Sequence, residues 1–180
     1  NIDAQRHIGL MYDFGEGVPE NDKAAVKWFT KAAEQGHAIS QFNVGLMYAI
    51  GNGVPKNDKT AVKWLTKAAE QGDANIQGSL GLMYVMGNSV PKNDKTAVKW
   101  LTKAAEQGHP IAQYNLGLKY DNGKGVLTDN RRAYMWYNLA SYNGSERGGK
   151  SKDDMAKKMT PADISKAQDM SSLCLESNYT

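Results

Sequence analysis

Side chains that commonly carry out chemistry in proteins are few in this sequence. It has three histidines, His7, His37 and His109, and one cysteine, Cys174, in 180 residues. The histidines are too far apart to form a metal site by spacing, and a lone cysteine without a nearby histidine motif is a weak signal for a nucleophile. G-x-S-x-G, P-loop and H-E-x-x-H motifs are absent. We therefore expect no catalytic residues, no metal and no cofactor, and no enzyme activity.

The composition is that of a folded protein, with 41% hydrophobic and 23% charged residues. The net charge is +3 and no basic arm is present, so nucleic acid is not an expected partner. No apolar run approaches the roughly 18 to 20 residues of a membrane span. We expect a monomer in which Cys174 is structural, although pairing with a cysteine outside this chain stays open.

The sequence repeats itself with a period of 36 residues, and this repeat predicts the fold. Residues 54–72 and 90–108 are both VPKNDKTAVKWLTKAAEQG. Three residue types recur at the same spacing: Gly9, Gly45, Gly81 and Gly117; Tyr12, Tyr48, Tyr84 and Tyr120; Trp28, Trp64, Trp100 and Trp136. We expect one domain over 1–180, with repeats at about 1–36, 37–72, 73–108 and 109–144 and a C-terminal cap at 145–180. Because residues 1–5 already fit the interior of a repeat, the N-terminus is expected to be trimmed.

Each repeat should contain two helices, which we call helix A and helix B. In helix A, apolar residues such as Val44 and Tyr48 are four apart, the spacing of one helical face. A glycine at the same point of every helix A predicts that helix B crosses there, since glycine in a helix costs about 1 kcal/mol relative to alanine. Later glycines should end each helix A: Gly15, Gly51, Gly87 and Gly123.

Helix B should begin near an acidic or amide residue that interacts with the free N–H groups of its first turn: Asp22, Asp58, Asp94 and Asn130. It should run for about 14 residues. Truncating one of its tryptophans to alanine is expected to cost about 3 to 5 kcal/mol. In the cap, Thr160 and Pro161 predict the start of a helix that extends to about Leu175.

These residues resemble the Sel-1-like repeat family, which is related to tetratricopeptide repeats. The resemblance covers about 1–144 and is close in AQYNLGLKYDNGKGV (112–126) and in VPKNDKTAVKWLTKAAEQG. It implies an all-α fold, a right-handed α/α superhelix of antiparallel helix pairs, and an adaptor role, often in periplasmic, secreted or host-facing bacterial proteins. A cysteine-rich branch of the family is associated with β-lactam handling, but this sequence lacks its paired cysteines.

The third repeat departs from the pattern at Ile76, Gly78, Ser79 and Ser89. Its helix A is therefore expected to start late or to pack differently.

The expected function is to bind a protein or peptide along the helix A surface. The helix B sequences of repeats two and three are identical, whereas their helix A sequences differ, so specificity should reside in helix A. By analogy with tetratricopeptide geometry, the candidate concave groove consists of Ile39, Phe42, Leu46, Ala49 and Ile50, then Leu82, Val85 and Met86, then Tyr114 and Leu118. Asp13 and Asp121 occupy the position of Ala49 and Val85 in the outer repeats, which suggests an apolar centre with charged edges.

Two alternatives to this interpretation stay open. The groove residues could simply fill space between adjacent helices A. The chain could also be a cell-wall or glycan-binding module, and a hydrolase is a less favoured possibility.

Overall fold

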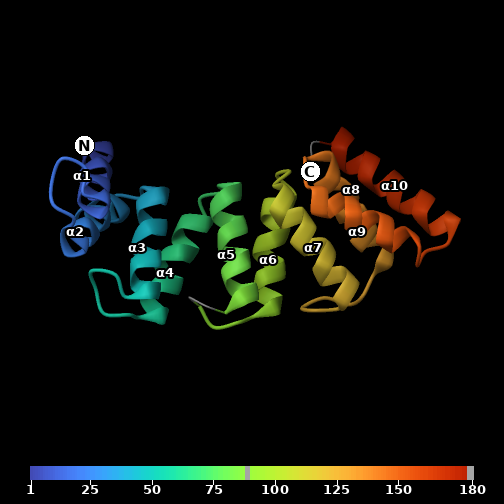
Figure 1. The fold of residues 1–180 in the computed structure, drawn as a ribbon, viewed down its shortest axis with the longest axis horizontal. Helices are drawn as coiled ribbons and strands as arrows, with labels where there is room; N and C mark the ends of the chain where they lie inside the picture. Colours follow the sequence, from blue (N-terminus) through green and yellow to red (C-terminus); the bar gives the residue numbers. More distant parts are fainter. Residues whose placement is uncertain (88–89, 178–180) are drawn as a thin grey trace. The chain divides into compact units, whose positions relative to one another are not determined.

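The computed structural model describes residues 1–87 and 90–177 (Figure 1). In these ranges the chain forms ten α-helices and no strand, as the repeat pattern predicts. They are α1 (Ile2–Phe14), α2 (Asp22–Glu34), α3 (Ala38–Ile50), α4 (Asp58–Ala69), α5 (Ala74–Met86), α6 (Asp94–Ala105), α7 (Pro110–Asn122), α8 (Asn130–Tyr142), α9 (Glu146–Ala156) and α10 (Pro161–Glu176). Helix A of each repeat is α1, α3, α5 or α7, and helix B is α2, α4, α6 or α8. Ser89, one of the departures in repeat three, lies outside the described residues.

The chain divides into two compact units. Unit 1 consists of Asn1–Ile76 and Gly87–Pro91, and unit 2 of Gln77–Met86 and Lys92–Thr180. In unit 1, α1 contacts α2, α2 contacts α3, and α3 contacts α4. In unit 2, α6 contacts α7, α7 contacts α8, and α8 contacts both α9 and α10. That the whole chain behaves as a single domain stays a prediction.

The helix A glycines lie where helix B crosses, as predicted. A Cβ atom on Gly45 would lie 2.6 Å from the side chain of Leu65, and one on Gly117 would lie 2.6 Å from the ring of Tyr137. Equivalent close approaches occur in the other repeats, at 2.7 Å between Gly9 and Phe29 and at 2.9 Å between Gly81 and Leu101. Only a residue without a side chain permits this helix spacing.

The most deeply buried large residue of helix B follows the tryptophan by one position. Phe29, Leu65, Leu101 and Tyr137 are at most 1% exposed. Trp100 and Trp136 are also buried, at 3% and 8%, but Trp28 and Trp64 are only half-buried. The expected loss of about 3 to 5 kcal/mol on truncation therefore applies to Trp100 and Trp136, and we expect smaller losses at the half-buried Trp28 and Trp64.

The N-caps of the B helices lie one residue earlier than predicted. The helices do begin at Asp22, Asp58, Asp94 and Asn130, but these residues are already in the first turn. The capping side chains accept from backbone N–H groups at 2.9 to 3.0 Å and belong to Asn21, Asn57, Asn93 and Asp129. The B helices are 12 or 13 residues long, slightly shorter than expected.

The histidines between repeats are N-caps of A helices. Nδ1 of His37 accepts from the backbone N–H of Ser40 at 3.1 Å, and Nδ1 of His109 accepts from that of Ala112 at 3.1 Å. In repeat three the same position is Asp73, whose carboxylate accepts from the N–H of Ile76 at 2.9 Å. Because α5 begins at Ala74, the position equivalent to the start of α3, the prediction of a late start is wrong.

Side-chain amides form a second connection between the helices. In unit 1, Gln71 donates to the Gln41 side chain at 2.8 Å, and Gln41 donates to the carbonyl of Ala33 at 3.0 Å. The same arrangement recurs in unit 2, where Asn143 donates to Gln113 at 2.9 Å and Gln113 donates to the carbonyl of Ala105 at 3.1 Å. The hydrogen bonds donated by Gln41 and Gln113 are buried and the other two are partly buried, so each contributes to the positions of the helix ends.

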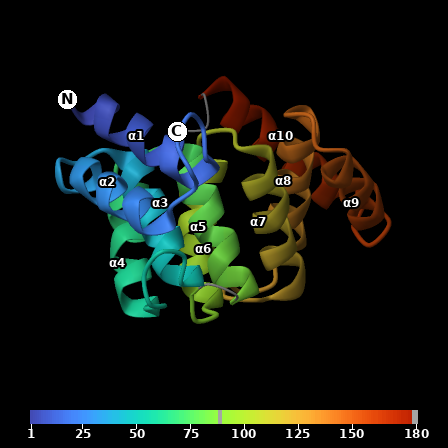
Figure 2. The same ribbon diagram turned by 60° about the vertical axis from the view of Figure 1, so that its left-hand side comes forward.

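The C-terminal segment is a cap made of two helices that both lie on α8, as Figure 2 shows. Thr160 is the N-cap of α10, with Oγ1 accepting from the N–H of Asp163 at 3.2 Å, which confirms the predicted start. The polar stretch before it forms α9, the other helix of the cap. Gly148 lets α9 approach α8 closely, since a Cβ there would lie 2.8 Å from that of Ala140.

The loop after helix A gives a matched pair of glycines for mutation. Gly17 and Gly53 occupy equivalent positions with φ of 75° and 67°. A Cβ on Gly53 would overlap the carbonyl of Asp22, whereas on Gly17 its only near neighbour would be the Met11 methyl group at 3.7 Å. We expect Gly17→Ala to cost about 1 to 2 kcal/mol from its left-handed backbone. Gly53→Ala should cost about 1 to 3 kcal/mol more through overpacking, measured by denaturant unfolding. Equal losses of stability in the two variants would contradict a packing role for Gly53.

Candidate partner-binding surface

Large apolar side chains are exposed mainly on the A helices. Phe14, Ile50 and Met86 share one repeat position at the end of α1, α3 and α5, and are 57% to 67% exposed. Ile39 and Ile111 share a second position, in the first turn of α3 and α7, and are 50% and 53% exposed. No comparably large apolar residue is exposed on α2, α4 or α6. Apart from Tyr142 on α8, the exposed large apolar residues of the repeat helices therefore lie on helix A.

The candidate residues of repeat two differ in accessibility. Ile39 and Ile50 are exposed, and Phe42 and Leu46 are half-buried. Ala49 is only 2% exposed, so a partner cannot contact it directly and we exclude it from the proposed surface. All of these residues are in unit 1.

The candidate residues of repeats three and four meet in unit 2. Leu82, Val85, Met86 and Tyr114 line one open cavity of about 490 Å³. A smaller cavity of about 170 Å³ contains Leu118 and shares Val85 and Asn115 with the first. The complete lining of the larger one adds Ile111, Asn115, Ser145 and Arg147. We call the two cavities together the α7 groove.

The floor of the α7 groove also belongs to the core. Leu82 and Val85 pack against the buried cluster that contains Leu101 and Leu116. Tyr114 lies against Tyr137, with ring centroids 5.9 Å apart. These half-buried residues therefore do fill space between helices, while Met86 and Ile111 extend the apolar surface outwards. The space-filling interpretation is thus right for part of the set.

Polar contacts hold the charged residues beside this groove. Lys119, whose side chain is 7% exposed, forms an ion pair with Asp94 at 2.6 Å between Nζ and Oδ1. The hydrogen bond from Lys119 holds the pKa of the Asp94 carboxyl below its usual value. Asp121, predicted as a charged edge, accepts from the Tyr137 hydroxyl at 3.3 Å and lies 3.9 Å from Lys158. Asp121 is therefore held by neighbouring helices.

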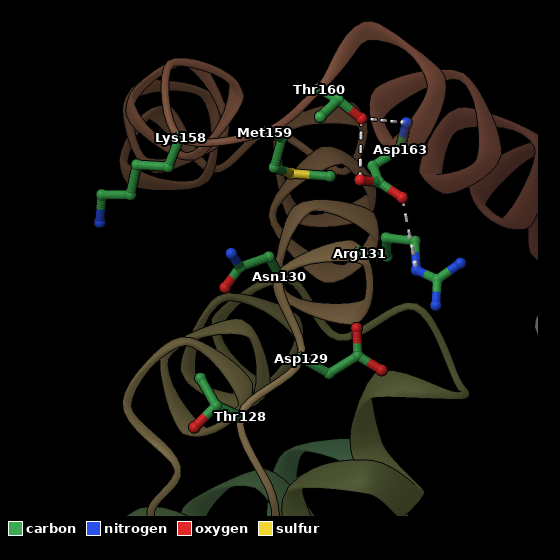
Figure 3. Close-up of a pocket in the computed structure, with 8 residues that line it drawn as sticks. All are labelled: Thr128, Asp129, Asn130, Arg131, Lys158, Met159, Thr160 and Asp163. Carbon is green, nitrogen blue, oxygen red and sulfur yellow. Dashed lines mark hydrogen bonds and ion pairs between the residues drawn. The ribbon is translucent and has the colours of Figure 1, made fainter.

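A third cavity lies elsewhere in unit 2, at the turns that precede α8 and α10 (Figure 3). It has a volume of about 680 Å³ and a mostly polar lining: Thr128, Asp129, Asn130, Arg131, Lys158, Met159, Thr160 and Asp163. Asp129 and Thr160 cap the two helices, and Arg131 lies 4.0 Å from Asp163. The charged side chains here are paired with neighbouring groups, as expected of adjacent helix starts.

Among residues 1–87 and 90–177, no three His, Cys, Asp or Glu side chains gather where they could hold a metal ion. Within the same ranges, none of the helices combines the length and apolar character that crossing a bilayer requires.

The paired helices, crossing glycines and apolar helix A surface define an α-helical repeat protein. Sel1 repeats match residues 2–37, 38–73, 77–109 and 110–145, and the chain belongs to the Sel1 repeat family. The matches agree with the predicted repeats to within one residue, except that the third begins at 77. Proteins of this family are generally non-enzymatic repeat scaffolds that serve as protein-interaction modules.

Solved bacterial structures resemble the chain. A Sel1 repeat protein of Oxalobacter formigenes is 43% identical over 86% of this chain and 63% of its own, with a TM-score of 0.77. A protective antigen of uropathogenic Escherichia coli strains, which displays an SLR fold, is 36% identical over 98% of this chain, with a TM-score of 0.79. The chain spans only 38% of that antigen.

Helicobacter pylori cysteine rich protein B is more distant. It is 26% identical over 75% of this chain and 97% of its own, with a TM-score of 0.53. The present sequence has a single cysteine, so the likeness concerns the repeat fold. No curated protein matches the sequence.

Five lining residues of the α7 groove were not predicted from the sequence: Asn115, Ser145 and Arg147, and, in the smaller cavity, Lys119 and Lys124. Asn115 lies on the predicted helix A, but its polar side chain did not fit the apolar pattern. Ser145 and Arg147 lie at the start of α9, beyond the last repeat. Only the placement of α9 against α8 brings them to the groove.

Proposed function

We propose that this protein is an interaction scaffold that binds a protein or peptide segment on its helix A surface. The observation that carries the proposal is the recurrence of exposed apolar residues at equivalent helix A positions, such as Met86 and Ile50. Contiguous exposed apolar surface commonly marks a site of protein interaction. Grooves between helices accept extended or helical peptides through a few apolar anchors.

The α7 groove is the part of this surface that can accept a side chain. Met86 and Ile111 stand at its margin, and Leu82, Val85 and Tyr114 form its floor. A partner residue placed there would cover apolar atoms on several sides, at about 25 cal/mol per Å² of surface removed from water. The lining contains one aromatic ring, which favours an aliphatic or aromatic side chain as ligand over a sugar that requires flat stacking surfaces.

Charge placed on the exposed margin should abolish partner capture. We expect Met86→Glu to reduce capture at least about tenfold, because it would bury an unpaired carboxylate against an apolar partner. Leu127→Glu is the matched control, since Leu127 is apolar and 90% exposed but lines neither cavity of the groove. Capture is measured by photo-crosslinking from a photoreactive amino acid placed at position 111. The crosslinked protein is then identified and purified.

The same experiment includes a test of location. A crosslinker at Lys99, on the exposed face of α6, should give little of the same product. Circular dichroism should show unchanged helicity for both glutamate variants. Equal crosslinking from positions 99 and 111, or full capture by Met86→Glu, would show that the partner binds another surface.

A further inference from the structure

The α7 groove is apolar at its floor and cationic at its ends. Arg147 lines the larger cavity, and Lys119 and Lys124 line the smaller one. Lys119 is balanced by Asp94, but Arg147 and Lys124 are exposed and form no ion pair within residues 1–87 and 90–177. Neither cavity has an aspartate or glutamate in its lining. The Asp94 carboxylate, whose pKa is lowered by Lys119 and also by Lys124, offsets part of this charge, and the three cations leave the groove with a net positive charge beside its apolar surface.

The two cavities adjoin each other along α7 and together define a path. They share Val85 and Asn115, and their lining runs from Ile111 in the first turn of α7 to Asn122 at its end. At a rise of about 1.5 Å per residue, this path is about 16 Å long. An extended chain advances by about 3.3 Å per residue, so about five residues would span it.

Two asparagines on this path can bind a peptide backbone. Asn115 donates to the carbonyl of Ile111 at 2.8 Å, and Asn122 donates to that of Leu118 at 2.9 Å. Each bond uses one N–H of the amide and fixes its orientation. The second N–H and the carbonyl oxygen can then donate to and accept from a chain lying alongside. Such contacts suit an extended segment, whose own backbone groups lack partners.

We propose that the α7 groove binds an extended acidic segment of about five residues, with one large apolar side chain in the larger cavity and carboxylates towards Arg147 and Lys124. Charge complementarity selects this occupant, because a basic segment would meet like charges at both ends and a neutral one would leave the net positive charge of the groove unpaired. This inference rests on the proposed function and specifies the chemistry of its partner.

The test uses fluorescent peptides with the full chain. The first peptide has leucine at its centre and aspartate two positions before and after it, in a glycine and serine background. The second has lysines in place of the aspartates, and the third has serine in place of the leucine. In fluorescence anisotropy we expect the first peptide to bind at least about tenfold more tightly than the other two, and its affinity to fall as salt is added.

Variants of the protein assign the charge preference to its residues. Arg147→Glu and Lys124→Glu should each weaken binding of the aspartate peptide roughly tenfold, and the double variant should bind the lysine peptide more tightly. Lys166→Glu makes the same charge change on the exposed side of α10 and should leave both affinities unchanged. Both predicted losses with an unaffected control would support the proposal.

The outcomes separate this inference from the proposed function. If the aspartate and lysine peptides bind equally and Met86→Glu abolishes both, the acidic preference is overturned while peptide binding in the groove stands. If none of the peptides binds but crosslinking from position 111 captures a partner, the inference is again overturned and the proposed function stands. Binding that survives Met86→Glu would place the peptide outside the groove and overturn the inference.

Discussion

Replacing Tyr137 with alanine is expected to destabilise unit 2 by about 3 to 5 kcal/mol. The side chain is 1% exposed and fills the space under the Gly117 backbone, where α7 crosses α8. Its removal leaves a cavity between two helices that neighbouring repeats hold in place, so collapse cannot fill it. Denaturant unfolding of the full chain, with hydrogen exchange of the α7 and α8 peptides, measures the loss and its location.

Tyr142→Ala is the matched control on the same helix. Tyr142 is 71% exposed, so its truncation should change stability by no more than about 0.5 kcal/mol. Tyr137→Phe removes only the hydroxyl that donates to Asp121 and should cost about 1 kcal/mol. Similar losses for the two alanine variants would mean that the Gly117 crossing is not a main source of stability.

Gly117→Ala is expected to destabilise the protein by about 1 to 3 kcal/mol, although alanine is the better helix former by about 1 kcal/mol. The new Cβ would lie 2.6 Å from the Tyr137 ring and 3.3 Å from the carbonyl oxygen of Ala133. A buried ring cannot move aside without disturbing α8. The same unfolding measurement tests whether Gly117→Ala lowers the stability of the protein although alanine favours the helix.

Gly149→Ala provides the comparison for a helical glycine without a rigid neighbour. Its Cβ would meet the Ser141 hydroxyl at 3.1 Å, and this side chain can rotate away. We expect a neutral or stabilising effect. In the double variant with Tyr137→Ala, Gly117→Ala should lose most of its penalty, because the clashing ring is gone. Additive effects in this cycle would contradict direct contact as the cause.

The repeat pattern predicted the helices well because glycine and proline mark backbone geometry directly. Gly51 and Gly123 have φ of 84° and 65°, as expected at the end of a helix. Periodicity was less informative about which of two adjacent apolar residues is deepest. Tryptophan recurs at one position, whereas the next position varies among Phe29, Leu65, Leu101 and Tyr137, and only its approach to the helix A glycine reveals its role.

The candidate site could be predicted only in part, because it depends on tertiary contacts. Val85, Met86 and Tyr114 were expected from their helix A positions and do line one cavity. Arg147 could not be expected there, since the polar stretch around Gly148 has a weak apolar pattern and resembles a linker. Helix α9 packs on α8, and the sequence of this stretch does not reveal that contact. A single repeat considered alone lacks that information.

The amide connections between repeats have a consequence for how this scaffold responds to its surroundings. Gln41, Gln113 and Asn143 do not titrate, and hydrogen bonds between neutral groups are screened little by ions. The hydrogen bonds that these amides form between helices should keep the same strength from acidic to alkaline solution and from dilute to concentrated salt. Binding of a ligand held by Arg147 and Lys124 would weaken as ionic strength rises, whereas these amide hydrogen bonds would not weaken. Added salt should then release the ligand while leaving the amide hydrogen bonds between the helices intact.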